Sequence, residues 1–543
     1  MTGFSKLLHI EESSPVRDRR IPAVMILLAV VTVITFANSL GNGFVWDDHQ
    51  ILALPEGGGF PSFSSMFGVD TVFHDEPVPY YRPLHRLIHL LELKFFGLDP
   101  RPFHAVNILL HTANVLLLFR LSLIFFESLF PAMVTALLFA VHPVNCEGVN
   151  FITSRQNMLA LFFTLSAALV YLRHFPEHRF WKSCLAALLF LGGLFCKETA
   201  LMPLVFLVTV FLFMPESKPG SRWSSIRSLT PFALALALYA ILRTAAVPIS
   251  QAQVITSKVS FWDRVGYNLY TLPKYMFNLT FPVKLSAYYQ LPVANLFGDP
   301  SIVVGWLLSA ALLGYLLYRR TRLELLVLLW LVINWLPISN IVPIPSAPMA
   351  DRYLYLPATG LWILAGSIAG DLHQRVGRNR LIPMVVVSLT VVLAALSVQR
   401  NRVWKDDISL FTSILKNEPQ SATASYNLGN ALFMAGRHDE ARAEFENSIR
   451  IKPDYDKALN ALGNLALMAD NLLAAEQYYQ KCLASNPGNS EAHFNLATIY
   501  ERIGRYREAY REYEMFLRRV PPEHAHLVPE IRQKFEVFRR KLE

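Results

Sequence analysis

Residues 21–40 read IPAVMILLAVVTVITFANSL, an uncharged run that is long enough to cross the hydrocarbon core of a bilayer. Arg17, Arg19 and Arg20 precede the run, and no cleavage site of small residues follows it. This combination predicts an uncleaved first span whose N-terminal tail, residues 1–20, is cytoplasmic. The whole composition agrees, because only 17% of the 543 residues are charged, against roughly a quarter in soluble proteins.

Ten further apolar stretches follow the first span, which predicts about eleven spans and a membrane domain over residues 21–400. These stretches are 103–125, 130–146, 155–172, 183–197, 199–214, 229–246, 302–318, 323–339, 353–370 and 381–399. The stretch 265–283 is ambiguous, because it contains Pro273 and Lys274. If it does not cross, every basic loop cluster lies on the cytoplasmic side. We therefore expect it to be re-entrant or interfacial, and the C-terminus to be exported.

A 34-residue repeat occupies residues 401–543, with Leu-Gly or Leu-Ala pairs beginning at Leu428, Leu462 and Leu496. Alanines, aromatic residues and prolines recur in the same register at 441, 475 and 509, at 445, 479 and 513, and at 453, 487 and 521. The pattern resembles the tetratricopeptide repeat, a pair of helices that stacks into a solenoid. It predicts a half repeat at 404–420, repeats at 422–455, 456–489 and 490–523, and a capping helix. We expect the concave face to bind a protein partner that the sequence does not name.

The first exported loop, residues 41–102, carries the acidic pair Asp47 and Asp48 just beyond the first span. A carboxylate at the membrane surface can act as a general base on a hydroxyl group. Further along the loop, Leu84, Leu91 and Phe95 recur at helical spacing among basic residues, which predicts an amphipathic helix in the membrane interface. An ordinary polar helix exit is the alternative reading of the acidic pair.

Other ionisable side chains lie in or beside the predicted spans, where they are costly and often functional. His111 shares one helical face with Asn107 and Asn114 in the second span, a pattern that interhelical hydrogen bonding also explains. With the topology above, one group of charged residues maps to the exported surface. Its members are Asp47, Asp48, Arg82, Glu147, Arg155, Lys197, Glu198, Asp351 and Arg352.

The composition supports neither a metal site nor a nucleic-acid-binding surface. The four cysteines have no ligand or disulfide spacing, and the carboxylates form no cluster along the chain. The net charge of +9 lies mostly in loops between apolar stretches, as the cytoplasmic loops of a membrane protein require. We therefore expect no metal, no cofactor and no nucleic acid as partner.

Several motifs in order resemble the transmembrane and tetratricopeptide repeat (TMTC) protein O-mannosyltransferase family of the GT-C glycosyltransferase superfamily. They are FVWDD, YYRPL, HPVNCEGVNFITSRQNMLALFF, CKETAL, ADRYLYLP and RNRVWKDDISLF, followed by the repeats. The resemblance implies a GT-C-like helical domain and a polyprenyl or dolichyl phosphate sugar as donor. It also implies a hydroxyl acceptor, on a protein or a glycan, at the exported side.

By this resemblance Asp47 or Asp48 would be the base, and we favour Asp47. The candidates for the lipid phosphate are Arg82, Arg155, Lys197 and Arg352, with Glu147 and Glu198 expected to hold these cations by pairing. His111 and Asp351 complete the predicted substrate site. The sugar donor counts as a substrate, so no cofactor is implied.

Two other functions remain open. An O-antigen ligase or polymerase also joins many spans to such repeats, but its large exported loop comes late in the chain. A non-catalytic membrane scaffold that recruits partners through its repeats is the other alternative. The short repeat array favours a bacterial inner-membrane protein with periplasmic repeats, and the endoplasmic reticulum with lumenal repeats is the alternative location.

Overall fold

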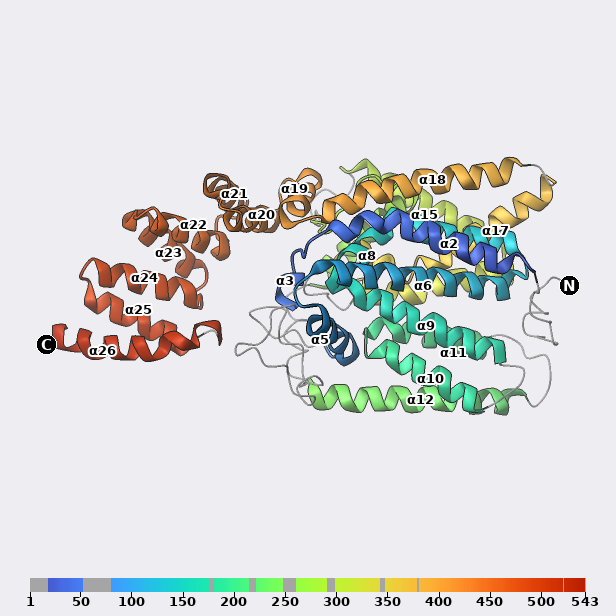
Figure 1. The fold of residues 1–543 in the computed structure, drawn as a ribbon, viewed down its shortest axis with the longest axis horizontal. Helices are drawn as coiled ribbons and strands as arrows, with labels where there is room; N and C mark the ends of the chain where they lie inside the picture. The colour runs from blue at the N-terminus through green and yellow to red at the C-terminus, as the bar shows by residue number, and fades with distance from the viewer. Residues whose placement is uncertain are drawn as a thin grey trace. The chain divides into compact units, whose positions relative to one another are not determined.

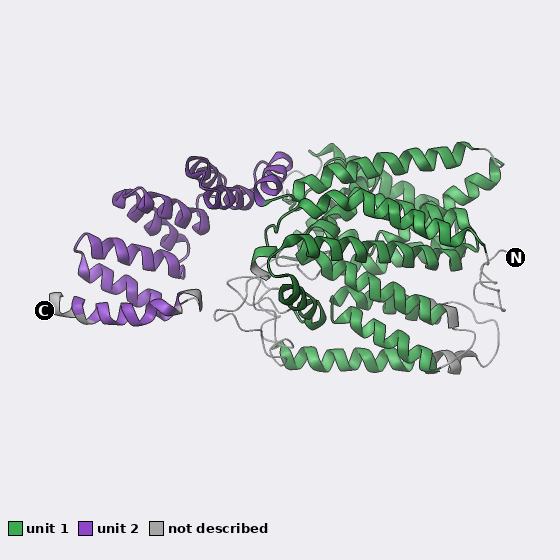
Figure 2. Ribbon diagram, viewed as in Figure 1, with its two compact units in different colours: residues 1–55, 59–406 green, residues 56–58, 407–543 purple. Residues whose placement is uncertain are grey.

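The structure is a computed structural model, and it describes the following parts of the chain. They are residues 18–51, 80–174, 180–213, 221–247, 260–290, 298–341, 347–377, 380–520 and 522–542. Every regular element in these parts is a helix, in agreement with the predicted all-α fold (Figure 1). The chain divides into two compact units with a boundary between Asp406 and Asp407 (Figure 2). The first unit carries the apolar helices and the second carries the repeats.

The first unit consists of long helices linked by short 3₁₀ turns, which are labelled η. In chain order they are α2 (Ile21–Phe36), η1 (Ala37–Gly41), α3 (Asp48–Ile51), α5 (Pro83–Phe96), α6 (Pro100–Phe126), α7 (Leu129–Val141), η2 (Pro143–Asn145), α8 (Cys146–Asn150), η3 (Ile152–Ser154), α9 (Arg155–His174), α10 (Phe180–Leu194), η5 (Glu198–Ala200), α11 (Leu201–Phe213), α12 (Ser221–Ala246), α14 (Phe261–Thr280), α15 (Pro300–Arg319), α16 (Arg322–Trp335), η6 (Leu336–Ile338), η7 (Asp351–Leu354), α17 (Thr359–Arg375), α18 (Leu381–Asn401) and η8 (Arg402–Trp404).

Six helices of the described residues are long and apolar enough to cross a membrane, or seven if the bent pair α7 and η2–α8 is one span. The six are Ile21–Gly41, Pro100–Phe126, Ile152–Leu172, Arg227–Ala246, Pro300–Arg319 and Leu381–Trp404. The predicted spans at 183–197 and 199–214 correspond to shorter apolar helices, Phe180–Leu194 and Glu198–Thr209. The helices α16 and α17 have 14 and 17 residues. The chain is thus a membrane protein by its apolar helices, while the number of eleven spans stays a prediction.

The ambiguous stretch forms α14, and its contacts favour a segment that does not cross. Arg264 in its first half donates to the backbone carbonyl of Ile341, and Asn268 donates to that of Ser339. Asn278 near its end donates to Asp351 at 3.3 Å. Residues 339–351 belong to the single connection between α16 and α17. Both halves of α14 thus hydrogen-bond to the connection between α16 and α17, and the interfacial placement of α14 stays a prediction.

Gly305 permits a close approach between α14 and α15, because a Cβ atom there would overlap the carbonyl group of Pro273. Backbone atoms cannot turn aside as a flexible side chain does, so we expect Gly305→Ala to destabilise the protein by about 1–3 kcal/mol. Gly314 on the same helix meets nothing within 4 Å. Gly314→Ala should therefore leave the thermal unfolding midpoint in detergent unchanged or raise it. Equal midpoints for both variants would contradict this account of the contact.

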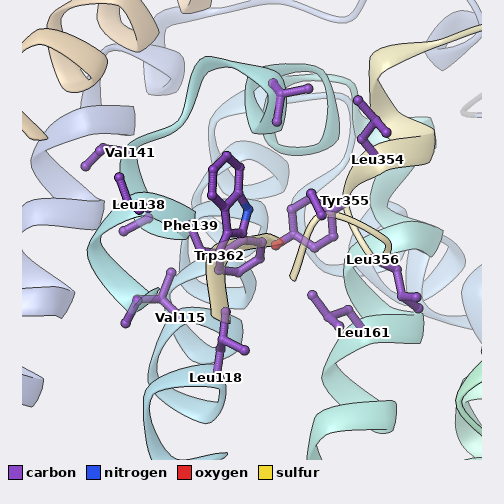
Figure 3. Packing of buried hydrophobic residues seen from close by; sticks show 14 of the residues in the cluster. Val115, Leu118, Leu138, Phe139, Val141, Leu161, Leu354, Tyr355, Leu356 and Trp362 are labelled. Atoms are coloured by element: carbon purple, nitrogen blue, oxygen red, sulfur yellow. The ribbon is translucent and has the colours of Figure 1, made fainter. Parts of the chain in front are cut away.

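The core of the first unit lies where α6 packs against α7 and α9. Figure 3 shows the rings of Phe139, Tyr355 and Trp362 gathered there, with aliphatic side chains from α6 beside them. The rings of Phe139 and Tyr355 meet edge to face, with centroids 5.2 Å apart. These contacts fix the ends of α6, α7 and α9, and two predicted site residues lie at those ends, Glu147 after α7 and Arg155 at the start of α9.

The second unit repeats one helix pair three times. Its elements are α19 (Asp407–Asn417), α20 (Ala422–Met434), α21 (His438–Ile451), α22 (Asp456–Met468), α23 (Leu472–Ser485), α24 (Ser490–Arg502), α25 (Tyr506–Arg518), η9 (Pro522–Leu527) and α26 (Val528–Leu542). The pairs α20–α21, α22–α23 and α24–α25 coincide with the three predicted repeats, α19 with the half repeat and α26 with the cap. Ala441, Ala475 and Ala509 are fully buried, because small residues are needed where paired helices touch.

Candidate active site

The end of the first span holds the acidic pair in place. After α2 and η1, the chain reaches Trp46 with φ of 54°, a left-handed conformation that costs a non-glycine residue about 1–3 kcal/mol. One oxygen of Asp48 accepts hydrogen bonds from the backbone N–H and the hydroxyl of Thr153, at 2.8 and 2.7 Å. The other oxygen accepts from the N–H of Val45 at 3.2 Å. The side chain of Asp48 thus ties the loop to η3.

The two aspartates therefore differ in surroundings. Asp48 is fully buried, and this burial raises its pKa to about 7, with hydrogen bonds from Thr153 and Val45 opposing the shift and Asp47 adding to it. Asp47 is half-buried and lies within electrostatic range of Arg352. A half-buried carboxylate can reach an incoming hydroxyl group, whereas both oxygens of Asp48 are already hydrogen-bonded. This difference favours Asp47 as the base.

Arg352 is held by Glu147, one of the two carboxylates expected to pair with a cation. The bend between α7 and α8 brings Glu147 toward η7, where its carboxylate accepts from the backbone N–H of Arg352 at 2.9 Å and from its guanidinium. Both side chains are almost completely buried. The guanidinium also lies over the rings of Phe151 and Tyr353, at 5.8 and 5.1 Å from their centroids. These contacts fix the guanidinium of Arg352 beside α8 and η7.

Arg82 forms the second predicted pair. It precedes α5 and donates through Nη2 to Glu198 at 2.9 Å, while its guanidinium lies 4.0 Å from the ring centroid of Tyr80. Lys197, which neighbours Glu198, is buried, donates to Asn157 and lies 5.3 Å from the ring centroid of Tyr353. Two more cations are thus placed beside the aromatic surroundings of Arg352.

The three cations influence one another. Burial lowers the pKa of Lys197 to about 7, and the positive charges of Arg82 and Arg352 lower it further than Glu198 and Glu147 restore it. Burial is the largest cause of this depression, and the excess of positive over negative charge around the amine adds to it. An anion bound among these cations would relieve the excess. The arrangement thus suits a phosphate group, with Asp47 on the Arg352 side.

Arg155 is enclosed by partners of its own, so its expected contact with the phosphate stays a prediction. The side chain is fully buried and donates to Glu92, to the side chain of Asn107 at 2.5 Å and to the carbonyl of Phe103 at 2.9 Å. Its nitrogens are directed into the packing between α5, α6 and α9. Charge and loop position alone predicted an open cation, but the guanidinium is enclosed by protein.

His111 and Asp351 also point elsewhere. His111 is fully buried in the core, where its Nδ1 lies 2.7 Å from the hydroxyl of Tyr355 and its ring packs against Phe36. Asp351 lies next to Arg352 in η7, but its carboxylate accepts a hydrogen bond from the hydroxyl of Tyr289 at 2.8 Å. Burial, with the charge of Glu147, raises the pKa of Asp351 to about 7. Both residues brace the bundle around the cluster.

The sequence did not single out three residues on the inner face of α5. His85, His89 and Glu92 are buried, whereas Leu91 and Phe95 on the other face are exposed. Polar residues at i, i+4 and i+7 in an apolar helix could have indicated this face. His89 lies 3.0 Å from His85 and 3.4 Å from Glu92. Within the described residues, no group of three or more His, Cys, Asp or Glu side chains is placed to hold a metal ion.

An apolar cavity of about 230 Å³ lies within the first unit. It begins on α11 and α17, whose preceding turns carry Lys197 and Arg352, and continues to the far ends of α6, α9 and α16. Its lining residues are Leu118, Leu121, Phe125, Thr164, Leu165, Ala167, Ala168, Tyr171, Leu172, Phe190, Pro203, Leu204, Phe206, Leu207, Phe232, Leu323, Leu326, Val327, Trp330, Thr359, Gly360 and Ile363. Almost all of this surface is hydrocarbon, which suits an aliphatic chain.

Comparison with known proteins bears on both units. Two family models described as tetratricopeptide repeat match residues 420–487 and 478–511. A protein O-mannosyl-transferase of Caenorhabditis elegans is 25% identical over 455 residues, covering 80% of this chain and 63% of that protein. Human protein O-mannosyl-transferase TMTC1 is 28% identical over 511 residues, covering 81% of this chain and 56% of the relative. Human protein O-mannosyl-transferase TMTC3 is 23% identical over 541 residues, covering 91% of this chain and 54% of that protein.

The chain thus spans 54% to 63% of the length of these relatives. They are animal proteins, so they give no support to the expected bacterial inner membrane. The resemblance inferred from the sequence is nevertheless confirmed: over about four fifths of its length or more this chain is similar to proteins named protein O-mannosyl-transferase, and its second unit carries tetratricopeptide repeats.

Proposed function

We propose that this chain is a membrane glycosyltransferase of the GT-C type. It would move a mannose-like monosaccharide from a polyprenyl or dolichyl phosphate sugar to a hydroxyl group, such as that of a protein serine or threonine, on the exported side. The observation that carries the proposal is the convergence of Asp47 with Arg352, Lys197 and Arg82, which come from separate segments of the chain.

The chemistry assigned to these groups balances without a further reactant. The acceptor hydroxyl gives its proton to Asp47 while its oxygen forms a bond to the anomeric carbon of the sugar. The bond between that carbon and the phosphate oxygen breaks, and the lipid phosphate leaves with the electron pair. Arg352, Lys197 and Arg82 stabilise the charge that develops on the leaving phosphate. Glu147 and Glu198 keep two of these cations oriented by pairing.

The apolar cavity supports a lipid carrier over a soluble nucleotide sugar. A polyprenyl chain needs an extended hydrocarbon surface, and the first turns of α11 and α17, the helices that follow Lys197 and Arg352 in the chain, line this cavity. A nucleotide would need polar partners for its base and ribose, which the lining of this cavity lacks. The carrier's length does not follow from these contacts.

The test is transfer of labelled mannose from synthetic polyprenyl phosphate mannose to a serine- and threonine-rich peptide, with the full-length protein in liposomes. Transfer that requires the lipid donor is the expected result. Transfer from a nucleotide sugar alone would refute the proposal. Binding of partners by the repeats, with no transfer from any lipid donor, would favour the scaffold function, and joining of long glycan chains would favour the ligase.

Lys197 should make donor binding depend on pH. Burial and the neighbouring arginines lower the pKa of its amine to about 7, so the amine loses its charge as the pH rises through that value. An anionic donor prefers the charged amine, so its KM should rise by up to about tenfold per pH unit above pH 7.

Lys197→Arg supplies the control, because a guanidinium keeps its charge throughout this range. Its donor KM should stay constant between pH 6 and 9. A flat profile in the wild type as well would remove Lys197 from the phosphate site, provided that transfer itself is observed.

A further inference from the structure

Three aromatic rings are stacked behind the loop that carries Asp47. The ring of Trp46 lies 5.8 Å from that of Phe151 with an interplanar angle of 15°. The ring of Trp404 in turn lies 5.5 Å from that of Phe151, with an interplanar angle of 28°. Trp404 is fully buried and is the last residue of η8, which follows the final helix of the first unit. The stack therefore joins the end of the first unit to the residue before Asp47.

Hydrogen bonds reinforce the same connection. Asn401, fully buried, donates to the carbonyl of Thr35 and to the side chain of Asn38, both at 2.9 Å, and accepts from Asn150 at 2.7 Å. The side chain of Asn42 donates to the carbonyl of Asn401 at 3.1 Å. The N–H of the next loop residue, Gly43, donates to the carbonyl of Lys405, four residues after Asn401, at 2.8 Å. Residues 401–405 are thus a support against which loop 42–48 is held.

The loop needs such a support. Trp46 holds a left-handed backbone conformation that a tryptophan adopts only when surrounding contacts impose it. On the far side, Asp48 is fixed by Thr153 and Val45. On the near side, the ring contact of Trp46 with Phe151 acts together with the hydrogen bonds of Asn42 and Gly43 to residues 401–405. Asp47 lies between the two anchors, so its position depends on both.

We propose that Trp404 is a positioning residue for Asp47, acting through the stacked rings of Phe151 and Trp46. The proposal rests on the proposed function for the role of Asp47 as base. Arg352 also lies over Phe151, but Glu147 holds it independently through its backbone and its guanidinium. Loss of the Trp404 ring should therefore disturb the base and leave donor binding intact.

The first measurement needs no transfer activity. Val45 is fully buried in this loop, and Cys184 is the exposed cysteine among the four. In full-length protein with Cys184→Ser and Val45→Cys, the new thiol should react slowly with a bulky maleimide. Adding Trp404→Ala should raise the labelling rate on the order of tenfold, the factor that one lost ring contact corresponds to. Trp404→Phe, which keeps an aromatic ring, should restore protection.

Trp362→Ala is the matched control. It removes another largely buried tryptophan of the same unit, whose ring packs on His142 away from loop 42–48. Labelling should stay slow in this variant. Equal labelling in Trp404→Ala and Trp362→Ala, or continued protection in Trp404→Ala, would overturn the proposal. Hydrogen exchange of a peptide covering residues 42–51 repeats the test without an added cysteine.

The second measurement separates positioning from a merely structural role. In the transfer assay, Trp404→Ala should lower kcat on the order of tenfold at unchanged donor KM, and Trp404→Phe should recover most of kcat. An unchanged kcat, or a loss that appears in donor KM alone, would contradict a role through Asp47. If wild-type protein transfers no sugar, the proposed function fails, whereas the labelling still decides whether Trp404 holds the loop.

Discussion

Asp47→Asn should lower sugar transfer by about 10²–10⁴-fold, because an amide cannot accept the proton of the acceptor hydroxyl. The protein should still fold, since Asp47 is half-buried, asparagine has nearly the same shape, and the hydrogen bonds of Asp48 to Thr153 and Val45 remain. The measurement is the initial rate of mannose transfer from polyprenyl phosphate mannose in liposomes. The thermal unfolding midpoint of each variant is recorded alongside.

Asp48→Asn is the matched control, with the opposite balance of effects. One side-chain oxygen must become an NH₂ group and would then face either the N–H of Val45 or the donors of Thr153. A buried donor without an acceptor costs about 1–3 kcal/mol, so this variant should lose stability. Full transfer activity in Asp47→Asn would remove the base from this residue. Full activity in both variants would show that neither Asp47 nor Asp48 is the general base.

Glu92→Ala should destabilise the first unit by about 3–5 kcal/mol, because it leaves the guanidinium of Arg155 buried without its counter-charge. Thermal unfolding in detergent measures the effect. Asp371→Ala is the control, since its ion pair with Arg319 is partly exposed and should contribute about 1 kcal/mol or less. Similar losses in the two variants would show that Arg155 does not depend on Glu92.

A double variant separates the two roles of Arg155. Replacing both partners with apolar residues, as in Glu92→Leu with Arg155→Met, often recovers the stability that a single deletion loses. If Arg155 only braces the helices, the double variant should fold and retain donor KM. A folded double variant with a strongly raised donor KM would return Arg155 to the phosphate site.

The sequence predicted best those features that depend on spacing along the chain. The 34-residue register gave the helix pairs of the second unit, because every repeat buries equivalent positions such as Ala441 and Ala475. The resemblance implied that Glu147 and Glu198 pair with cations, and the structure supplies the partners, Arg352 and Arg82. Periodicity thus predicted buried positions within the repeats, whereas the partner of each carboxylate depends on the fold.

Features that depend on contacts between distant segments were not predictable in this way. Asp47 and Asp48 are neighbours of equal charge, and only the placement of Thr153 distinguishes them. The sequence around Arg155 suggested a cation accessible to a ligand, yet its guanidinium donates to the carboxylate of Glu92 on another helix. The amphipathic pattern of α5 was recognised from its apolar residues. Its buried polar residues were not considered as a second face. A pattern indicates which residues share a face, whereas the neighbour of that face is a property of the fold.

The convergence of four separate segments has a practical consequence for dissecting this unit. A fragment that starts after α5 would lack both the base and Arg82, and one that stops before η7 would lack Arg352. Neither fragment should transfer sugar, so we expect every deletion in this unit that removes one of these segments to abolish transfer completely. Complementation by two co-expressed halves that reassemble in the bilayer is the form in which truncated chains would regain chemistry.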